Sequence, residues 1–196
     1  MARPKAADHD LQRDRILSAA VSAFASVGYP SASMAQLALA CGTSKAGLYH
    51  YYVSKEALLF DALNHYTLRL LQLGQSVVAR GLPADQTLQA LIRTFLAEYR
   101  SAHDYHVALL NDVKFLAVAQ RDQIRDQERA VVQVFAKCIG KAYPKRARDQ
   151  AMLMATTMAL LGMINFTFAW LRAEGPLSDQ QFADLVIDLW QRGLTG

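Results

Sequence analysis

Residues 34–52 read MAQLALACGTSKAGLYHYY, a stretch that predicts two short helices joined by a tight turn. Ser33 directly precedes the first predicted helix and can cap it, since a serine hydroxyl accepts a hydrogen bond from a free amide of the first turn. Gly42 suits the turn, because glycine adopts the left-handed backbone conformation without steric cost. Either of the hydroxyl residues that follow, Thr43 and Ser44, can cap the second helix. This arrangement predicts a helix-turn-helix motif, whose second helix enters the major groove of DNA.

The second predicted helix carries side chains suited to DNA on its outward face. Leu48 and Tyr52 have the spacing to pack inward. Small outward residues permit a close approach of the backbone to DNA, and the larger ones donate to phosphates or base edges. The predicted DNA-contacting residues are Ser44, Lys45, Ala46, Gly47, Tyr49 and His50, followed downstream by Lys55. Spacing alone equally fits a surface helix beside an aromatic cluster, so DNA binding is one of two interpretations of this pattern.

The rest of the chain extends the helical pattern to an all-α fold. Of 196 residues, 53% are hydrophobic and 19% are charged, a composition that can bury a core and excludes a disordered or fibrous chain. Only five prolines and ten glycines are present, and the turn clusters that separate many short strands are missing. We predict about nine helices, arranged as a helix-turn-helix DNA-binding domain over residues 1–54 and a helical ligand-binding and dimerisation domain over residues 55–196.

Apolar residues three and four positions apart mark the longer helices that follow the turn motif. One such helix is predicted to run unbroken from Lys55 to about Val78. A later helix is predicted to place Val107, Leu110 and Asn111 on its core side.

Residues 151–171 contain no charged side chain, over a length within the range of a membrane-spanning helix. Polar residues inside the stretch, among them Asn165, favour instead a helix buried in a bundle or a dimer interface, continuing until Gly175 and Pro176 break it. No apolar segment follows the charged residues 1–10, so no secretory signal is predicted. The expected location is the cytoplasm, with no membrane partner.

The turn motif and its surroundings resemble the amino-terminal domain of the TetR family of transcriptional regulators, over roughly residues 11–66. The similarity lies in RILSAAVSAFASVGYPSASMAQLALACGTSKAGLYHYYVSKEALL, which starts at Arg15. Two residues depart from the family pattern, because Thr43 stands where valine is usual and Tyr52 where phenylalanine is usual. Neither departure removes a DNA contact, but the hydroxyl of Tyr52 needs a partner if it is buried.

This resemblance implies a homodimer whose two recognition helices enter successive major grooves of a palindromic operator, about 34 to 36 Å apart. It assigns DNA binding to Lys45, Tyr49, His50 and Lys55. It also implies that Ser33 holds a phosphate through its hydroxyl and the amino end of the helix that follows. The dimer interface would form from the last two helices, around residues 150–172 and 179–192.

Residues 109–116 (LLNDVKFL) and 162–171 (GMINFTFAWL) resemble the branch of the TetR family that represses acyl-CoA degradation, such as fatty-acid or phenylacetate breakdown. This second resemblance implies an acyl-CoA thioester as the inducer, with its acyl chain in a carboxy-terminal cavity. Arg121, Arg125 and Arg129 recur every four residues and form a basic stripe able to receive the phosphates of the nucleotide. A solvated helix face explains the same charges, since an acidic residue precedes the second and third arginines by three positions.

Polar and methionine residues in the apolar carboxy-terminal half are further ligand-binding candidates. Asn111, Asp112 and Asn165 must find partners if they are buried, and they could orient a ligand. Asn165 equally suits a hydrogen bond across a dimer interface. Met158 suits an irregular apolar ligand, although methionine also simply fills gaps in a core.

Motifs of enzyme active sites and metal centres are missing from the sequence. No GxSxG, HExxH, P-loop or GxGxxG motif occurs, so we expect no catalytic residues, no cofactor and no enzyme. Cys41 and Cys138 lie far apart and outside metal-ligand spacing, and His103 with His106 lacks a third ligand by spacing, so no metal is expected. The net charge of +4 permits nucleic acid or an anionic ligand without proving either.

These observations predict a dimeric, ligand-responsive DNA-binding repressor. In the predicted mechanism, a ligand in the cavity favours a state in which helix 55–78 swings and the recognition helices no longer match the half-site spacing. Two alternatives stay open: a TetR-type repressor of an efflux system that senses apolar drugs, and a membrane-associated helical adaptor anchored by residues 151–171.

Overall fold

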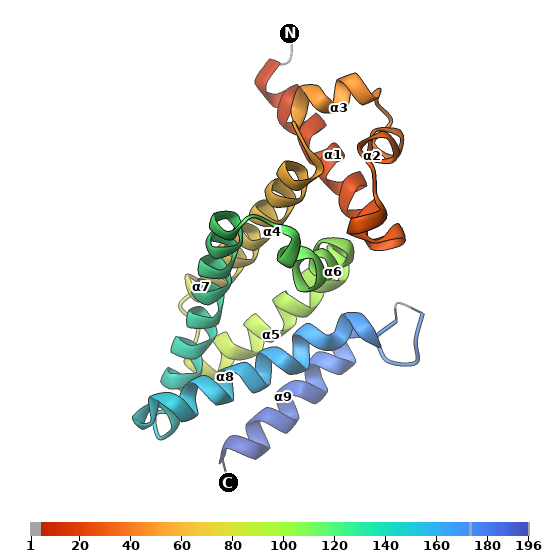
Figure 1. The fold of residues 1–196 in the computed structure, drawn as a ribbon. Coiled ribbons are helices and arrows are strands. Elements are labelled where there is room, and N and C mark those ends of the chain that lie inside the picture. The colour runs from red at the N-terminus through yellow and green to blue at the C-terminus, as the bar shows by residue number, and fades with distance from the viewer. Residues whose placement is uncertain (1–4, 173, 196) are drawn as a thin grey trace. The chain divides into compact units, whose positions relative to one another are not determined.

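The computed structural model describes residues 5–172 and 174–195, and this part of the chain forms nine α-helices, four short 3-10 helices and no strand (Figure 1). The all-α prediction is therefore confirmed. The α-helices are α1 (Lys5–Val27), α2 (Met34–Ala40), α3 (Lys45–Tyr51), α4 (Lys55–Val78), α5 (Ala84–Ser101), α6 (His103–Asp112), α7 (Val118–Ala142), α8 (Gln150–Asn165) and α9 (Asp179–Thr195). The 3-10 helices are η1 (Tyr29–Ser31), η2 (Val113–Phe115), η3 (Arg146–Arg148) and η4 (Phe166–Ala169).

The first compact unit comprises residues 1–66 and 104–124. Its helix-turn-helix part packs α1 against α2, and α2 against α3. Fully buried apolar side chains hold these helices together, namely Ile16, Leu17, Phe24, Leu37, Leu48, Leu58, Leu59 and Leu63. Short helices such as α2 and α3 gain most of their stability from this packing rather than from intrinsic propensity.

The second compact unit comprises residues 67–103 and 125–196. Helix α5 is central to it and packs against both α8 and α9. Phe95 of α5 and Phe135 of α7 meet edge to face with ring centroids 4.9 Å apart, in a core that Leu91, Leu160, Ile164 and Val186 extend. Helices α4 and α7 each contribute to both units, so the predicted domain boundary at residue 54 stays a prediction.

Helix caps fix the turn motif as the sequence predicts. The Ser33 hydroxyl accepts from the amide of Gln36 at 3.3 Å, and the Gln36 side chain accepts from the Ser33 amide at 2.9 Å, which together make a capping box. Of the two candidate caps for α3, Ser44 is the one used, accepting from the Gly47 amide at 2.9 Å. Gly42 has a φ of 64°, the left-handed conformation expected for it.

Two predictions about the later helices are wrong. The apolar stretch 151–171 is not helical throughout, because α8 ends at Asn165 and a single 3-10 turn follows it. The hydroxyl of Thr167 donates to the carbonyl of Ile164 at 2.7 Å, which offers the backbone an alternative to the α-helical pattern. On α6, Leu110 and Asn111 are exposed, and the helix buries His106, Ala108 and Leu109 instead.

Residues 150–169 form a helical stretch that by length and composition alone is apolar enough to cross a membrane. About a third of this window (33%) is buried. A core helix of a soluble protein passes the same test, so this stretch is weak support for the membrane-adaptor alternative.

Candidate nucleic-acid interface and effector domain

A hollow of about 480 Å³ lies where the start of α2, helix α3 and the start of α4 meet. It brings together four of the eight predicted DNA-contacting residues, namely Ser33, Lys45, Tyr49 and Lys55. Ser44, the cap of α3, and Ala46 and His50 of α3 are exposed outside this lining. Glu56 also lines the hollow, so its charge opposes the two lysines there.

Contacts within the protein account for glycine at position 47. A Cβ atom at Gly47 would lie 2.5 Å from Oγ1 of Thr43 and 3.2 Å from Oγ of Ser44, which is closer than side chains tolerate. Gly47 is half-buried rather than fully outward. The contact with the capping turn therefore explains this glycine without a DNA backbone beside it.

Lys55 has internal partners for its ammonium group. Its Nζ donates to the carbonyls of Tyr29 at 3.1 Å, Pro30 at 3.2 Å and Ala32 at 3.1 Å. It also lies 4.6 Å from the centroid of the Tyr29 ring, within the range of a cation–π contact. These bonds tie the first turn of α4 to the segment that leads into the Ser33 cap.

Asp61 of α4 gathers two partners that the sequence does not reveal as a group. It accepts from Nε of Arg13 at 2.8 Å and from the hydroxyl of Tyr52 at 2.6 Å. Burial alone would raise the pKa of Asp61, but the bonds from Arg13 and Tyr52 outweigh it and hold the pKa below its usual value. The expected partner for the Tyr52 hydroxyl is thus found.

The basic residues before and early in the first helix, Arg3, Lys5, Arg13 and Arg15, are sequence candidates for phosphate or minor-groove contacts. Of these, Arg13 is bonded to Asp61 inside the protein. Arg3 lies outside the described residues, and of Lys5 only the backbone is described.

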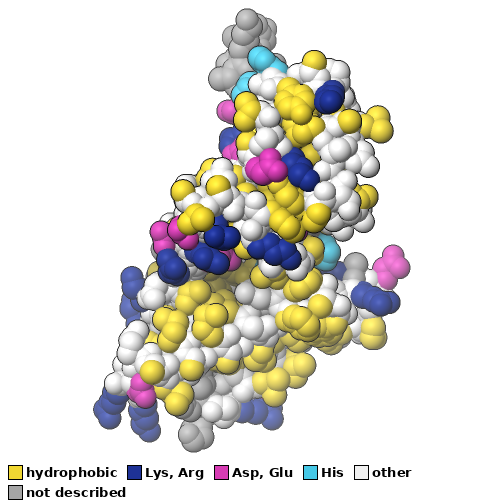
Figure 2. Space-filling view, viewed as in Figure 1, with side chains coloured by type: hydrophobic (Ala, Val, Ile, Leu, Met, Phe, Trp, Pro, Cys, Tyr) yellow, Lys and Arg dark blue, Asp and Glu magenta, His cyan; other side chains and the backbone are white. Residues whose placement is uncertain are grey.

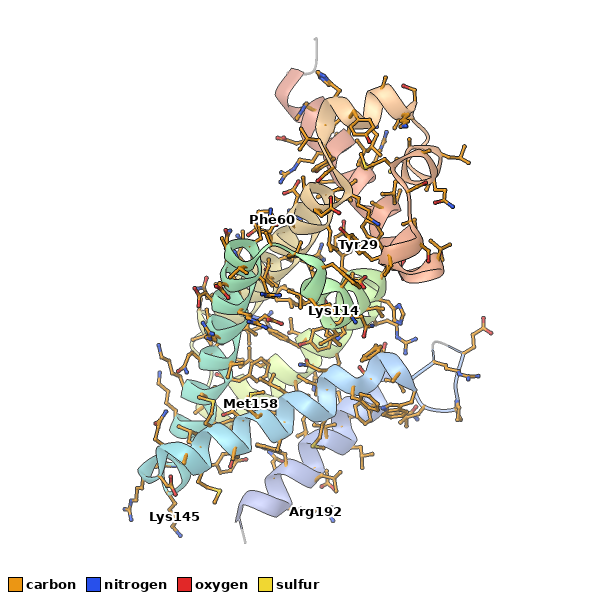
Figure 3. The ribbon with its side chains drawn as sticks, in the orientation of Figure 1. Tyr29, Phe60, Lys114, Lys145, Met158 and Arg192 are labelled. Carbon is orange, nitrogen blue, oxygen red and sulfur yellow. The ribbon has the colours of Figure 1, made fainter. Side chains whose placement is uncertain are left out.

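An aromatic stack joins η1 to η2 within the first unit, and the sequence gives no sign of it. The rings of Tyr29 and Phe115 lie 4.9 Å apart at an interplanar angle of 22°. Lys114, next to Phe115, lies 5.2 Å from the Phe115 ring, and Figure 3 shows Lys114 in the same region as Tyr29. The segment before the Ser33 cap is thereby packed against η2, which follows α6.

The predicted ligand-binding residues are spread over several elements. Asn111 is exposed and Asp112 is half-buried at the end of α6, where burial raises the Asp112 pKa. Asn165 is half-buried at the end of α8, and Met158 of α8 is 52% exposed (Figure 3). None of these four lines the hollow formed by the starts of α2 and α4 and by α3.

The three arginines of the predicted stripe all lie on α7, with Arg121 half-buried and Arg125 and Arg129 exposed. Arg129 is ion-paired with Asp126, as the solvated-face interpretation expects. The side chain of Arg121 has its Nε buried without a hydrogen-bond partner. Among the described residues, no group of three or more His, Cys, Asp or Glu side chains is placed to hold a metal ion.

Comparison with known proteins identifies the family. Residues 16–62 match the family described as bacterial regulatory proteins of the tetR family, and residues 81–194 match the tetracyclin repressor-like carboxy-terminal domain. The chain belongs to the TetR family. Members of this family regulate transcription rather than catalyse reactions.

Solved structures share the fold of this TetR-family regulator over nearly the whole chain. A TetR-family regulator from Bordetella parapertussis is 30% identical, covering 91% of this chain and 93% of that one, with a TM-score of 0.86. PfmR from Thermus thermophilus is 26% identical, covering 92% and 99%, with a TM-score of 0.81. AibR, solved with isovaleryl coenzyme A and operator DNA, is 24% identical, covering 91% and 97%, with a TM-score of 0.81.

Sequence relatives match over shorter stretches. The transcriptional repressor KstR2 of Rhodococcus jostii is 28% identical over 110 residues, which are 56% of this chain and 54% of that protein. The transcriptional regulator UidR of Escherichia coli is 47% identical over 47 residues, 24% of each chain. The matched segment thus spans about half of KstR2 or less than a quarter of UidR.

The second unit of this TetR-family regulator leaves large apolar side chains exposed on its last two α-helices, on η4 and just after η4. These side chains are Met152, Met158, Phe166, Trp170, Leu185 and Leu189, each between 46% and 61% exposed. Figure 2 shows hydrophobic side chains gathered over the region of α8. Large exposed apolar groups of this kind mark interaction surfaces.

Proposed function

We propose that this TetR-family regulator is a dimeric repressor that binds a palindromic operator through α3 and is released by an acyl-CoA thioester. The observation that carries the DNA-binding half is the hollow lined by Ser33, Lys45 and Tyr49. The ammonium of Lys45 and the phenol of Tyr49 can donate to phosphates, whereas the Ser33 hydroxyl donates to Oε1 of Gln36 at 2.8 Å. His50 is exposed on α3, the helix that carries Lys45 and Tyr49. A seven-residue helix held by an internal cap presents these groups on a rigid element.

Dimerisation through α8 and α9 is supported by the apolar residues that these helices leave exposed. Phe166, on η4 directly after α8, is 61% exposed, and Leu189 of α9 is 53% exposed. A second copy of the chain would remove these side chains from water at about 25 cal/mol per Å² of apolar area. Two-fold symmetry would then pair two recognition helices with two half-sites.

The acyl-CoA inducer is supported by relatives and by charge. AibR, which shares this fold, was solved with isovaleryl coenzyme A, and the arginines of α7 provide exposed cationic groups for a nucleotide. Glu128 lies among these arginines, and burial raises its pKa although Arg125 and Arg129 oppose the rise.

The test is fluorescence anisotropy with labelled DNA from immediately upstream of the gene, at fixed salt, with acyl-CoA thioesters and their free acids titrated separately. We expect one thioester to release the DNA while its acid does not. Arg125→Ala should weaken that response by about tenfold, since one charge-assisted contact contributes roughly 1.5 kcal/mol. Arg148→Ala, which removes an exposed arginine of η3, is the matched control.

Different outcomes of this experiment would contradict different parts of the proposal. If the DNA binds and every thioester is inert, the inducer assignment falls while the operator assignment stands. Release by an apolar drug instead would favour the efflux-regulator alternative. Partition of the protein into the membrane fraction, with no DNA binding, would favour the adaptor alternative.

A further inference from the structure

A cavity of about 490 Å³ lies in the second unit, apart from all the residues assigned above. Its walls come from the last turns of α4, the connection to α5, the first turn of α5 and the carboxy-terminal half of α7. The volume falls in the lower half of the range of small-molecule sites, which run from about 300 to 1,000 Å³. The lining therefore suits a compact ligand.

Most of the cavity wall is apolar. Val78, Leu82, Val134 and Cys138 contribute side chains to it. Val78 is 43% exposed and Leu82 is 39% exposed, so both leave hydrocarbon in contact with water at the rim. Burial raises the pKa of Cys138 to about 11, so its thiol is neutral and serves as part of the apolar wall.

Two lysine side chains place positive charge next to this apolar wall. Lys137 and Lys141 both line the cavity and lie four residues apart on one face of α7. No acidic side chain belongs to the lining, and neither lysine forms an ion pair with the described residues. Asp85, on the first turn of α5 next to Ala84, is outside the lining. Like charges at this spacing repel each other, and an anion between them would relieve the repulsion.

We infer that this cavity is a binding site for a small amphipathic carboxylate, the free acid of a medium-length hydrocarbon chain. The carboxylate lies between the ammonium groups of Lys137 and Lys141, where it accepts charge-assisted hydrogen bonds. The hydrocarbon covers Val78, Leu82 and Val134 and removes their exposed surface from water. This site is distinct from the one proposed for the acyl-CoA inducer, because none of the residues assigned to that inducer lines the cavity.

Calorimetric titration of the full-length protein with sodium octanoate tests the assignment, with octanol and octylamine as uncharged and cationic probes of the same chain length. We expect saturable binding of octanoate below about 1 mM and binding of octanol and octylamine at least about tenfold weaker. The double variant Lys137→Gln/Lys141→Gln should weaken octanoate binding by about tenfold or more. Lys145→Gln, an exposed lysine outside the cavity, should bind as the wild type does.

A second variant fills the cavity without touching the charges. Val78→Trp enlarges a side chain that is already at the rim, and it should abolish octanoate binding while the melting temperature stays near that of the wild type. Equal octanoate binding in wild type, the double lysine variant and Val78→Trp would overturn the assignment. So would equal affinity for octanoate and octanol, or no octanoate binding up to about 10 mM.

Discussion

Lys55 shows how one side chain can affect operator binding from inside the protein. Its ammonium donates to three carbonyls of the segment that ends at the Ser33 cap. Lys55→Gln should therefore loosen that segment and weaken operator binding without removing a phosphate contact. The slope of log affinity against log salt should stay at the wild-type value, whereas Lys45→Gln should reduce its magnitude by about two, since the dimer loses one phosphate contact at each half-site.

Anisotropy titrations at several salt concentrations separate these two roles for Lys55. Lys55→Gln should also lower the melting temperature, and Lys45→Gln should not, because Lys45 is exposed. A drop in the magnitude of the salt slope of about two in Lys55→Gln would instead make Lys55 a direct phosphate contact at each half-site, as the family resemblance implies.

Asp61 makes part of the stability dependent on pH. Its folded-state pKa lies below the ordinary value near 3.9, so its contribution is complete well above that pH and disappears as the pH falls through the folded-state pKa. Asp61→Asn should reduce the free energy of unfolding by about 1–2 kcal/mol at pH 7, since Arg13 and Tyr52 both lose an ionised acceptor. The difference from wild type should shrink below about pH 4.

Urea denaturation at a series of pH values measures this difference. Tyr52→Phe is the control, because it removes one neutral donor and leaves the bond between Arg13 and Asp61, costing about 1 kcal/mol. A pH-independent gap between wild type and Asp61→Asn would contradict the assigned ionisation.

Individual residues also show what local sequence can and cannot reveal. The caps at Ser33 and Ser44 follow from neighbouring residues, so they are predictable. Tyr52 stands where the family usually has phenylalanine, so its hydroxyl is expected to need a hydrogen-bond partner. The sequence does not identify Asp61 as that partner. Arg13 bonds to Asp61 across 48 residues of sequence, a distance over which periodicity carries no information.

At the scale of single elements, α3 makes the clearest prediction. Tyr49 and His50 are exposed on it, while Leu48 is fully buried. Tyr49→Ala and His50→Ala should each weaken operator binding by about 1–3 kcal/mol and leave the dimer intact, because truncating exposed side chains leaves the core unchanged. Anisotropy and sedimentation measure the two properties. Ser18→Ala, exposed on α1, serves as control, and unchanged operator affinity in both α3 variants would contradict the assignment of the recognition helix.

The elements that sequence mispredicts are those where a tertiary or side-chain contact overrides periodicity. The apolar stretch after residue 150 contains no charge or proline to mark an end before residue 172, yet α8 ends at Asn165 and a 3-10 turn follows, in which the Thr167 hydroxyl donates to the carbonyl of Ile164. On α6, His106 is buried in the first unit with its ring 6.3 Å from Tyr66, which an apolar pattern cannot anticipate. Helix α4 is predictable throughout, because its stripe of leucines is long and regular.

At the scale of the whole molecule, regulation requires that ligand and operator share one equilibrium. Helix α4 runs continuously from Lys55, which bonds to the turn before α2, to Val78, which belongs to the second unit. A ligand that favours one position of α4 would alter operator affinity by the same factor by which the operator alters ligand affinity. The family and the all-α fold follow from sequence, whereas the ligand depends on cavity shapes that only the folded chain defines.

Dimerisation raises operator affinity, because each short recognition helix binds only one half-site. Leu189→Glu on α9 and Phe166→Glu on η4 place a charge where apolar side chains are 53% and 61% exposed, so each should convert the dimer to a monomer with its helical circular dichroism retained. Operator affinity should fall by about a hundredfold or more, because the second half-site then no longer binds at high effective concentration.

Sedimentation equilibrium measures the loss of the dimer, and anisotropy measures the loss of operator affinity. The control is Val118→Glu, at an apolar position 63% exposed on α7, which should stay dimeric. If both α8–α9 region variants remain dimers with full operator affinity, the two copies must associate through another surface, and the exposed apolar residues of these helices would need a different partner.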